Sequence, residues 1–274
     1  MLRQAAKTTA IITATFLAVV MTMGTAVAQE EDLNEADKYM QRGDFKKAAA
    51  SYDRAIRKWP KQVAPAAYGQ RARIFIVQKR YRAGLRWIDD IAAKQHPGAA
   101  DILEQKALML WTLGSKEDGA RVAQEVVKKK PYAFTNQKIL GEWYHQRKQP
   151  RQTTRALEQF FKHRPSEISK GDVLPRIHLG LAYLQLGNDK EAEKQFDNIL
   201  KKHKNRPHAE VNANNGLCAA YTKMGKFDQA IALCERIVQN PKRVDRGGSV
   251  WFNLGQAYLF KKQPTQARTA GMEF

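Results

Sequence analysis

The sequence predicts an all-α fold built from about seven helix hairpins in tandem, and three observations support this prediction. The segment Trp251–Tyr258 has the pattern W-x-x-L-G-x-x-Y, and weaker copies of it recur upstream. Small and aromatic residues keep the same phase within the copies, as expected for one packing unit that is repeated. The copies follow each other at intervals of 34 to 39 residues. Their starts lie near residues 29, 65, 100, 134, 173, 211 and 248.

This pattern resembles the opening signature of the tetratricopeptide repeat family. Each repeat of that family is a helix hairpin of about 34 residues, which cannot bury its apolar face alone. The resemblance therefore implies a right-handed superhelical solenoid over residues 29–274, with the seventh repeat incomplete. It also implies a protein that binds other molecules rather than one that catalyses a reaction.

The first three copies differ in how well they keep the pattern. The first is a good copy, the second and third are looser, and the third lacks the usual aromatic residues. Small residues at the eighth and twentieth positions let the two helices of a hairpin approach closely, and aromatic side chains fill the gaps beside them. The residues in phase are Ala36, Tyr39, Gly43, Ala48 and Pro60, then Ala72, Phe75 and Gly84, then Ala107, Gly114, Gly119 and Pro131.

The fourth to sixth copies follow the pattern more closely. Along the whole chain, spacings longer than 34 residues indicate extra residues, which we expect between hairpins, where a solenoid tolerates insertions. The residues in phase are Gly141, Tyr144 and Pro165, then Gly180, Tyr183, Ala192 and Phe196, then Cys218, Tyr221, Gly225 and Ala230.

Residues 1–28 have the features of a cleaved secretory signal peptide. Arg3 and Lys7 precede an apolar run over residues 10–20, and residues 26–28 read A-V-A, a typical cleavage site. An uncleaved membrane anchor is the alternative, but the strongly apolar part is shorter than the ~20 residues that a bilayer span needs. No cysteine that could carry a lipid follows the run directly. We therefore expect an exported protein and, by resemblance, the periplasm of a Gram-negative cell.

The chain is strongly basic, with 47 lysines and arginines against 27 aspartates and glutamates and a formal net charge of +20. Cations concentrate at the ends of predicted second helices, where they complement the helix dipole on a solvated edge. The alternative is a basic edge that attracts acidic proteins, an anionic lipid surface or an anionic polysaccharide. The aromatic residues lie at packing positions and no recognition motif is present, so a nucleic acid partner is not expected. The two basic clusters singled out are Lys128, Lys129 and Lys130, and Lys201, Lys202 and Lys204.

Cys218 and Cys234 occupy the eighth and twenty-fourth positions of the sixth copy, on either side of its hairpin turn. They are expected to face each other at the same level along the two antiparallel helices of the hairpin. In an oxidising compartment they would form a disulfide that closes a loop of about 15 residues and contributes about 3 kcal/mol. The alternative is two buried thiols that act as small core residues.

The sequence contains no pattern typical of an enzyme or a metal site. Six histidines are scattered along the chain, without an H-E-x-x-H motif, a nucleophile elbow or a phosphate-binding glycine loop. Two cysteines at this spacing do not make a metal site. We therefore predict no catalytic, cofactor-binding or metal-binding residues.

The resemblance places partner binding on the concave face, which first-helix residues line at the second, fifth, ninth, twelfth and thirteenth positions. Some members of the family hold a peptide's terminal carboxylates with a lysine and asparagine clamp, but Ile177 and Leu181 occupy the corresponding positions of the fifth copy. Exposed apolar residues there suit a helix or an extended segment laid along the groove. The alternative is that tighter packing buries these residues. The predicted groove residues are Glu142, His145, Gln146, Ile177, Leu181, Leu184, Gln185, Asn215, Ala219 and Lys223.

Together these observations predict a non-enzymatic adaptor that binds other proteins of a bacterial envelope assembly. The assembly would serve secretion, surface motility or pili, polysaccharide export or wall growth. One alternative is direct binding of an anionic envelope polymer or membrane surface through the basic clusters. The other is the interaction arm of a longer protein that continues beyond Phe274, which the incomplete seventh repeat favours. The sequence does not distinguish a monomer from an oligomer.

Overall fold

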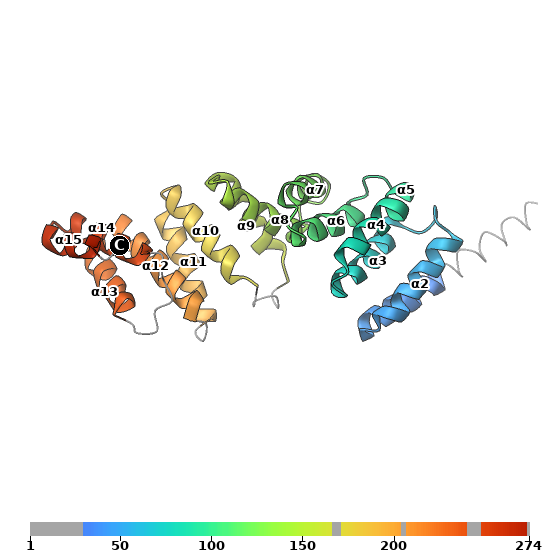
Figure 1. Cartoon of the computed structure of the whole chain (residues 1–274), viewed down its shortest axis with the longest axis horizontal. Helices are drawn as coiled ribbons and strands as arrows, with labels where there is room; N and C mark the ends of the chain where they lie inside the picture. Colours follow the sequence, from blue (N-terminus) through green and yellow to red (C-terminus); the bar gives the residue numbers. More distant parts are fainter. Residues whose placement is uncertain (1–29, 166–170, 204–206, 240–247, 273–274) are drawn as a thin grey trace, which may run out of the picture. The chain divides into compact units, whose positions relative to one another are not determined.

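The fold is all-α, as the sequence predicts. The computed structural model describes residues 30–165, 171–203, 207–239 and 248–272, and all regular secondary structure in these ranges is helical (Figure 1). No helix within these ranges is long and apolar enough to cross a membrane. The predicted signal peptide and Lys204 lie outside the described residues. The chain divides into two compact units, Met1–Glu125 and Val126–Phe274.

The first unit begins with a helix over residues 30–42 that packs on α2 (Phe45–Lys58), since Ala36 and Tyr52 share one buried cluster. The Asp44 side chain caps α2 by accepting a hydrogen bond from the backbone N–H of Lys47. The helices that follow are α3 (Pro65–Val77), α4 (Tyr81–Trp87), η1 (Ile88–Ala92), α5 (Ala93–Gln95), α6 (Ala100–Thr112) and α7 (Lys116–Lys129).

The second helix of the second hairpin contains a π-helical turn, η1, between α4 and α5. A π turn is wider than an α turn and takes up an additional residue. The second copy of the repeat is 35 residues long, one more than the family's usual length of about 34. The additional residue thus lies inside a hairpin here, whereas the sequence analysis expected all such residues between hairpins.

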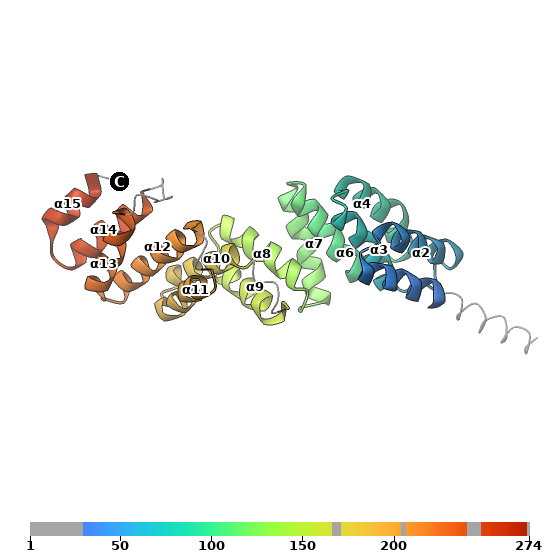
Figure 2. The ribbon, with the colours of Figure 1, turned by 90° about the horizontal axis from the view of Figure 1, so that it is seen from below.

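The second unit contains four hairpins, each made of two consecutive helices that contact each other within the described ranges (Figure 2). The pattern of helix hairpins predicted from the sequence is therefore confirmed. The first and second helices of the four hairpins are α8 (Phe134–Gln146) and α9 (Pro150–His163), α10 (Val173–Gln185) and α11 (Asp189–Lys202), α12 (Pro207–Lys223) and α13 (Phe227–Val238), and α14 (Ser249–Phe260) and α15 (Pro264–Met272).

Phe196 on α11 is the point at which two neighbouring hairpins of the second unit meet. Its ring is completely buried between two glycines, Gly180 on α10 and Gly216 on α12. A Cβ atom at Gly180 would lie 2.6 Å from the ring, and one at Gly216 would also overlap it. Glycine at these positions thus lets three helices close around one aromatic side chain.

A buried ion pair connects the fourth and fifth hairpins. The Arg164 guanidinium, after α9, lies 2.6 Å from the carboxylate of Asp172, before α10, and their side chains are 7% and 1% exposed. Burial raises the pKa of the Asp172 carboxyl, although Arg164 and Arg176 lower it. Since both charges are removed from water, each depends on the other for compensation.

Candidate functional site

The first helices of the second unit form a continuous surface. α8 contacts α10, α10 contacts α12, and α12 contacts α14. Side-chain contacts join each of these pairs. We call this surface the first-helix face and define it by His145 and His178, Leu184 and Lys223, and Asn215 and Asn253.

Two histidines from neighbouring hairpins stack on this face. The rings of His145 on α8 and His178 on α10 are nearly parallel, with 3.9 Å between their centroids. Burial lowers the pKa of His178 to about 4, with a further contribution from His145, and burial also lowers the pKa of His145. Both imidazoles are therefore neutral at physiological pH, which permits close stacking of two groups that would otherwise repel each other.

The stacked pair predicts a loss of stability in mild acid. Because the folded-state pKa values of both histidines are lowered, stability is complete above the ordinary value of 6.5 and decreases as the pH falls toward about 4. Replacing His178 by glutamine is expected to flatten this part of a stability–pH profile measured by urea unfolding. The matched control is His163→Gln, at an exposed histidine on α9. If the free energy of unfolding falls equally steeply with decreasing pH in both variants, the stacked pair does not cause the loss of stability in acid.

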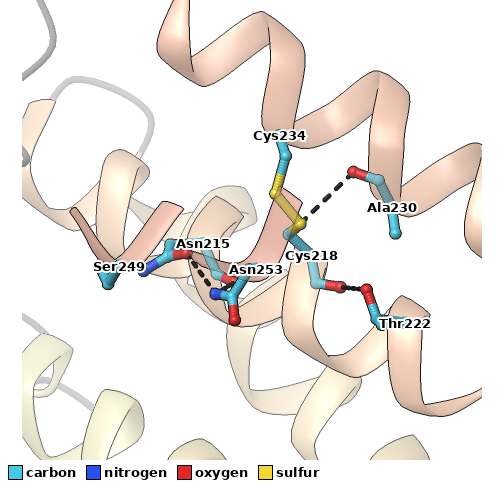
Figure 3. The surroundings of a disulfide bond; sticks show 7 residues. All are labelled: Asn215, Cys218, Thr222, Ala230, Cys234, Ser249 and Asn253. Atoms are coloured by element: carbon cyan, nitrogen blue, oxygen red, sulfur yellow. Dashed lines mark hydrogen bonds between the residues drawn. A yellow bond between two sulfur atoms is a disulfide. The ribbon is translucent and has the colours of Figure 1, made fainter. Parts of the chain in front are cut away.

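Polar side chains connect the other first helices. The Lys223 ammonium on α12 donates a hydrogen bond to the backbone carbonyl of Leu184 on α10. The Asn253 amide on α14 donates to the Asn215 side-chain oxygen at 2.7 Å, and the Asn215 amide donates to the Ser249 hydroxyl at 2.8 Å (Figure 3). These bonds hold Asn215 and Lys223, both on α12, in defined positions.

The apolar members of the predicted groove are largely buried. Leu184 is only 6% exposed and belongs to the core, and Ile177 and Leu181 pack against that core as half-buried residues. The structure thus favours the alternative in which packing buries these residues. The exposed leucine of this region is Leu174, which is 53% exposed at the start of α10.

Leu174 and Ile177 line a cavity of about 300 Å³ between the beginnings of α10 and α12. His208 and Asn212, both exposed on α12, add polar groups to its rim. The described residues that line this opening, which we call the Leu174 cavity, are Gly171, Val173, Leu174, Ile177, His208, Ala209 and Asn212. A mostly apolar lining with two exposed polar side chains suits the side chain of a bound protein segment.

The remaining predicted groove residues lie on first helices. Glu142 lies 3.9 Å from the ammonium of Lys138 on the same helix. Gln146 and Gln185 are exposed, and Ala219 is half-buried against the core of the second unit.

Cys218 on α12 and Cys234 on α13 are joined by a disulfide, with 5.9 Å between their Cα atoms (Figure 3). Both residues are completely buried. The bond holds the two helices of the sixth hairpin together from inside. By restricting the unfolded chain, a loop of this size contributes about 3 kcal/mol to stability.

The two basic clusters lie at the ends of second helices. Lys128, Lys129, Lys201 and Lys202 are exposed, and Lys130 is half-buried. Within the described parts of the chain, no group of three or more histidine, cysteine or acidic side chains could hold a metal ion.

The sequence analysis did not select several residues that the structure brings to the surface of the second unit. His178 and Asn253 each occupy the sixth position of a repeat, outside the positions that the family resemblance selects. Leu174 lies at the second position, but the alignment of the fifth copy emphasised Ile177 and Leu181 instead. The second position of the fifth copy already points to Leu174, whereas His178 and Asn253 are found only if every residue of the first helices is considered.

Comparisons with known proteins agree with this architecture. A sequence profile of the tetratricopeptide repeat matches residues 33–92 and 177–243. No curated protein is similar enough in sequence to count as a match.

Solved structures with similar folds have low sequence identity to this chain. YrrB, described as a tetratricopeptide protein with an unusual peptide-binding site, is 13% identical over 82% of this chain and 99% of its own, with a TM-score of 0.54. The structure of Naa15/Naa10 bound to HypK-THB matches 89% of this chain and 36% of its own at 13% identity, with a TM-score of 0.50. A tetratricopeptide repeat protein from Parabacteroides merdae is 18% identical over 89% of this chain and 93% of its own, with a TM-score of 0.48. At these identities, the likeness to the first two structures shows the fold.

Proposed function

Because a tetratricopeptide repeat profile matches residues 33–92 and 177–243, and proteins built from this repeat act as protein-interaction scaffolds, we propose that the chain holds a segment of a partner protein on the first-helix face of its second unit. The observation that carries this proposal is the Leu174 cavity. A leucine that is 53% exposed in a mostly apolar lining offers a place for a partner's side chain. The similarity of fold to YrrB, whose description names a peptide-binding site, agrees with this kind of partner.

The polar groups of the same face would select and orient the segment. Exposed Gln185 and Asn212 are able both to donate and to accept hydrogen bonds to a peptide backbone. Asn215 and Lys223 are already held by neighbouring helices, so they lose little freedom when a partner binds.

Export to the periplasm of a Gram-negative cell, in an envelope assembly, is part of this proposal. Its support is the predicted signal peptide over residues 1–28 together with the Cys218–Cys234 disulfide, since disulfides persist mainly in oxidising compartments. N-terminal sequencing of the protein from its native cells should give a mature chain that starts at Gln29. An intact Met1 would contradict export by this route.

An affinity pull-down from native envelope extract tests the binding site. Residues 29–274 serve as bait, and the variant Leu174→Glu is expected to lose most of the partner recovered by the unaltered chain because a carboxylate then occupies the apolar cavity. The matched control is Leu259→Glu, a leucine that is 61% exposed on α14 and outside the Leu174 cavity. Recovery should survive a high-salt wash, since apolar contacts are not screened.

The same experiment examines binding of an anionic polymer through the basic clusters. A Lys201→Glu/Lys202→Glu variant, at exposed lysines that line neither cavity, should retain the protein partner if the Leu174 cavity is the site. Recovery of only salt-sensitive polymer, lost in this variant and kept in Leu174→Glu, would overturn the proposed function.

A further inference from the structure

A second cavity of the second unit shares no lining residue with the Leu174 cavity. It has a volume of about 490 Å³, within the range of sites that hold small molecules or several side chains. Residues from the end of α7 and from α8 and α9 surround it. Its lining residues are Val127, Lys128, Pro131, Gln137, Leu140, Tyr144, Gln152, Arg155, Ala156 and Gln159.

Two cations of this cavity carry no compensating charge. Lys128 and Arg155 are both exposed, and neither forms an ion pair in the described part of the chain. None of the described residues that line the cavity is acidic. A guanidinium and an ammonium on two sides of one concave surface suit a ligand that brings two or more carboxylates.

The rest of the lining indicates that the ligand is a peptide. Val127, Leu140 and Ala156 provide aliphatic walls that would accept an apolar side chain. Gln152 and Gln159 add amides, which are able to pair with both the N–H and the C=O groups of an extended backbone. Gln137 is fixed by its hydrogen bond to the carbonyl of Pro131, at 3.0 Å, which holds this side of the cavity in place.

We propose that this cavity is a second binding site, which takes an acidic segment of a partner protein. One apolar side chain of the segment enters between Val127, Leu140 and Ala156. Flanking glutamates or aspartates pair with Arg155 and Lys128. The site is separate from the Leu174 cavity, so it operates whether or not the proposed function is correct.

Fluorescence anisotropy with synthetic peptides tests the proposal. The probes are fluorescein-labelled nonapeptides with a central leucine flanked by two to four glutamates, and the comparison peptides carry glutamine in place of glutamate. The variant Lys128→Ala/Arg155→Ala should bind the acidic probes at least about tenfold more weakly than the unaltered chain, because each lost charged hydrogen bond costs about 1.5–3 kcal/mol. The glutamine peptides should bind weakly to every variant.

The matched control is Arg151→Ala/Lys162→Ala, which removes two exposed cations of α9 that do not line the cavity. This variant has the same net charge as Lys128→Ala/Arg155→Ala, so binding driven by overall charge would fall equally in both. A second variant, Gln152→Trp, fills the opening without changing the charge and should also weaken binding. Circular dichroism verifies that each variant remains helical.

Three results would overturn the proposal. The first is the absence of binding to any acidic probe at millimolar protein concentration. The second is an equal loss of binding in the two double variants. The third concerns an acidic polysaccharide such as polygalacturonate, tested separately as a competitor. The proposal fails if Lys128→Ala/Arg155→Ala weakens binding of the polysaccharide and leaves binding of the acidic peptides unchanged.

Discussion

Replacing Phe196 by alanine is expected to lower the free energy of unfolding of the second unit by about 3–5 kcal/mol. The ring is completely buried, and α10 and α12 close around it through Gly180 and Gly216. Removal of the ring leaves a cavity that neither helix is able to fill without shifting the hairpin to which it belongs. Urea unfolding followed by circular dichroism measures the loss.

Two glycine-to-alanine substitutions, with a third as a control, test the packing around Phe196 by adding a methyl group next to its ring. Gly180→Ala and Gly216→Ala push a methyl group into the Phe196 ring, and each is expected to cost about 1–3 kcal/mol. Gly255→Ala is the matched control because its Cβ would lie 3.6 Å from the carbonyl oxygen of Ala267, an ordinary contact. Since alanine is favoured over glycine within a helix by about 0.8–1 kcal/mol, Gly255→Ala should be neutral or stabilising.

A smaller side chain at position 196 should compensate for the added methyl group. The loss caused by Gly180→Ala should therefore be smaller in a Phe196→Leu background than in the unaltered chain. If all three alanine variants unfold alike, close packing around Phe196 does not determine the stability of this hairpin pair.

Replacing Asp172 by alanine is expected to have an effect of similar size, about 3–5 kcal/mol. The substitution leaves the Arg164 guanidinium, whose side chain is 7% exposed, without the carboxylate that lies 2.6 Å from it. Arg176 loses the same favourable charge, although its guanidinium keeps a hydrogen bond to Gln195 at 2.9 Å. An uncompensated charge in a buried site costs far more than the net contribution of the intact pair.

A double-mutant cycle separates this cost from other effects of the substitution. Arg164→Met/Asp172→Leu removes both charges and should be much less destabilising than Asp172→Ala alone. The control pair is Lys194→Ala and Glu191→Ala, since the ion pair between these side chains on α11 is exposed and is expected to contribute less than about 1 kcal/mol. Additive losses for Arg164 and Asp172 would show that the pair is not coupled.

The fold was predictable from the sequence because the repeat spaces its small and aromatic residues regularly. How closely the helices pack at each glycine was not predictable. Gly255 lies in the best match to the family signature, W-x-x-L-G-x-x-Y, yet it has more room than Gly180 or Gly216. How tightly a helix packs depends on the side chain opposite, and Phe196 comes from another helix. For Gly216, Phe196 also belongs to the preceding repeat, so a pattern within one repeat does not contain that information.

The candidate site was predictable only in outline. His145, Asn215 and Lys223 were selected by position, and the structure places each against a residue of the neighbouring hairpin. Leu184 was expected in an exposed groove, but the packing of α10 against its neighbours buries it. Lys128 and Arg155 line the same cavity because of the way consecutive hairpins stack, which residue spacing alone does not specify.

Photocrosslinking most directly tests the central claim that a partner lies on the first-helix face. A benzophenone amino acid is placed at Leu174 or Asn212, at the Leu174 cavity, and for comparison at Gln229 or Arg236, exposed on the second helix α13. In native cells, crosslinks to one defined protein should form from the first two positions and not from the other two. Crosslinks only from Gln229 and Arg236 would contradict the account and assign binding to the second helices.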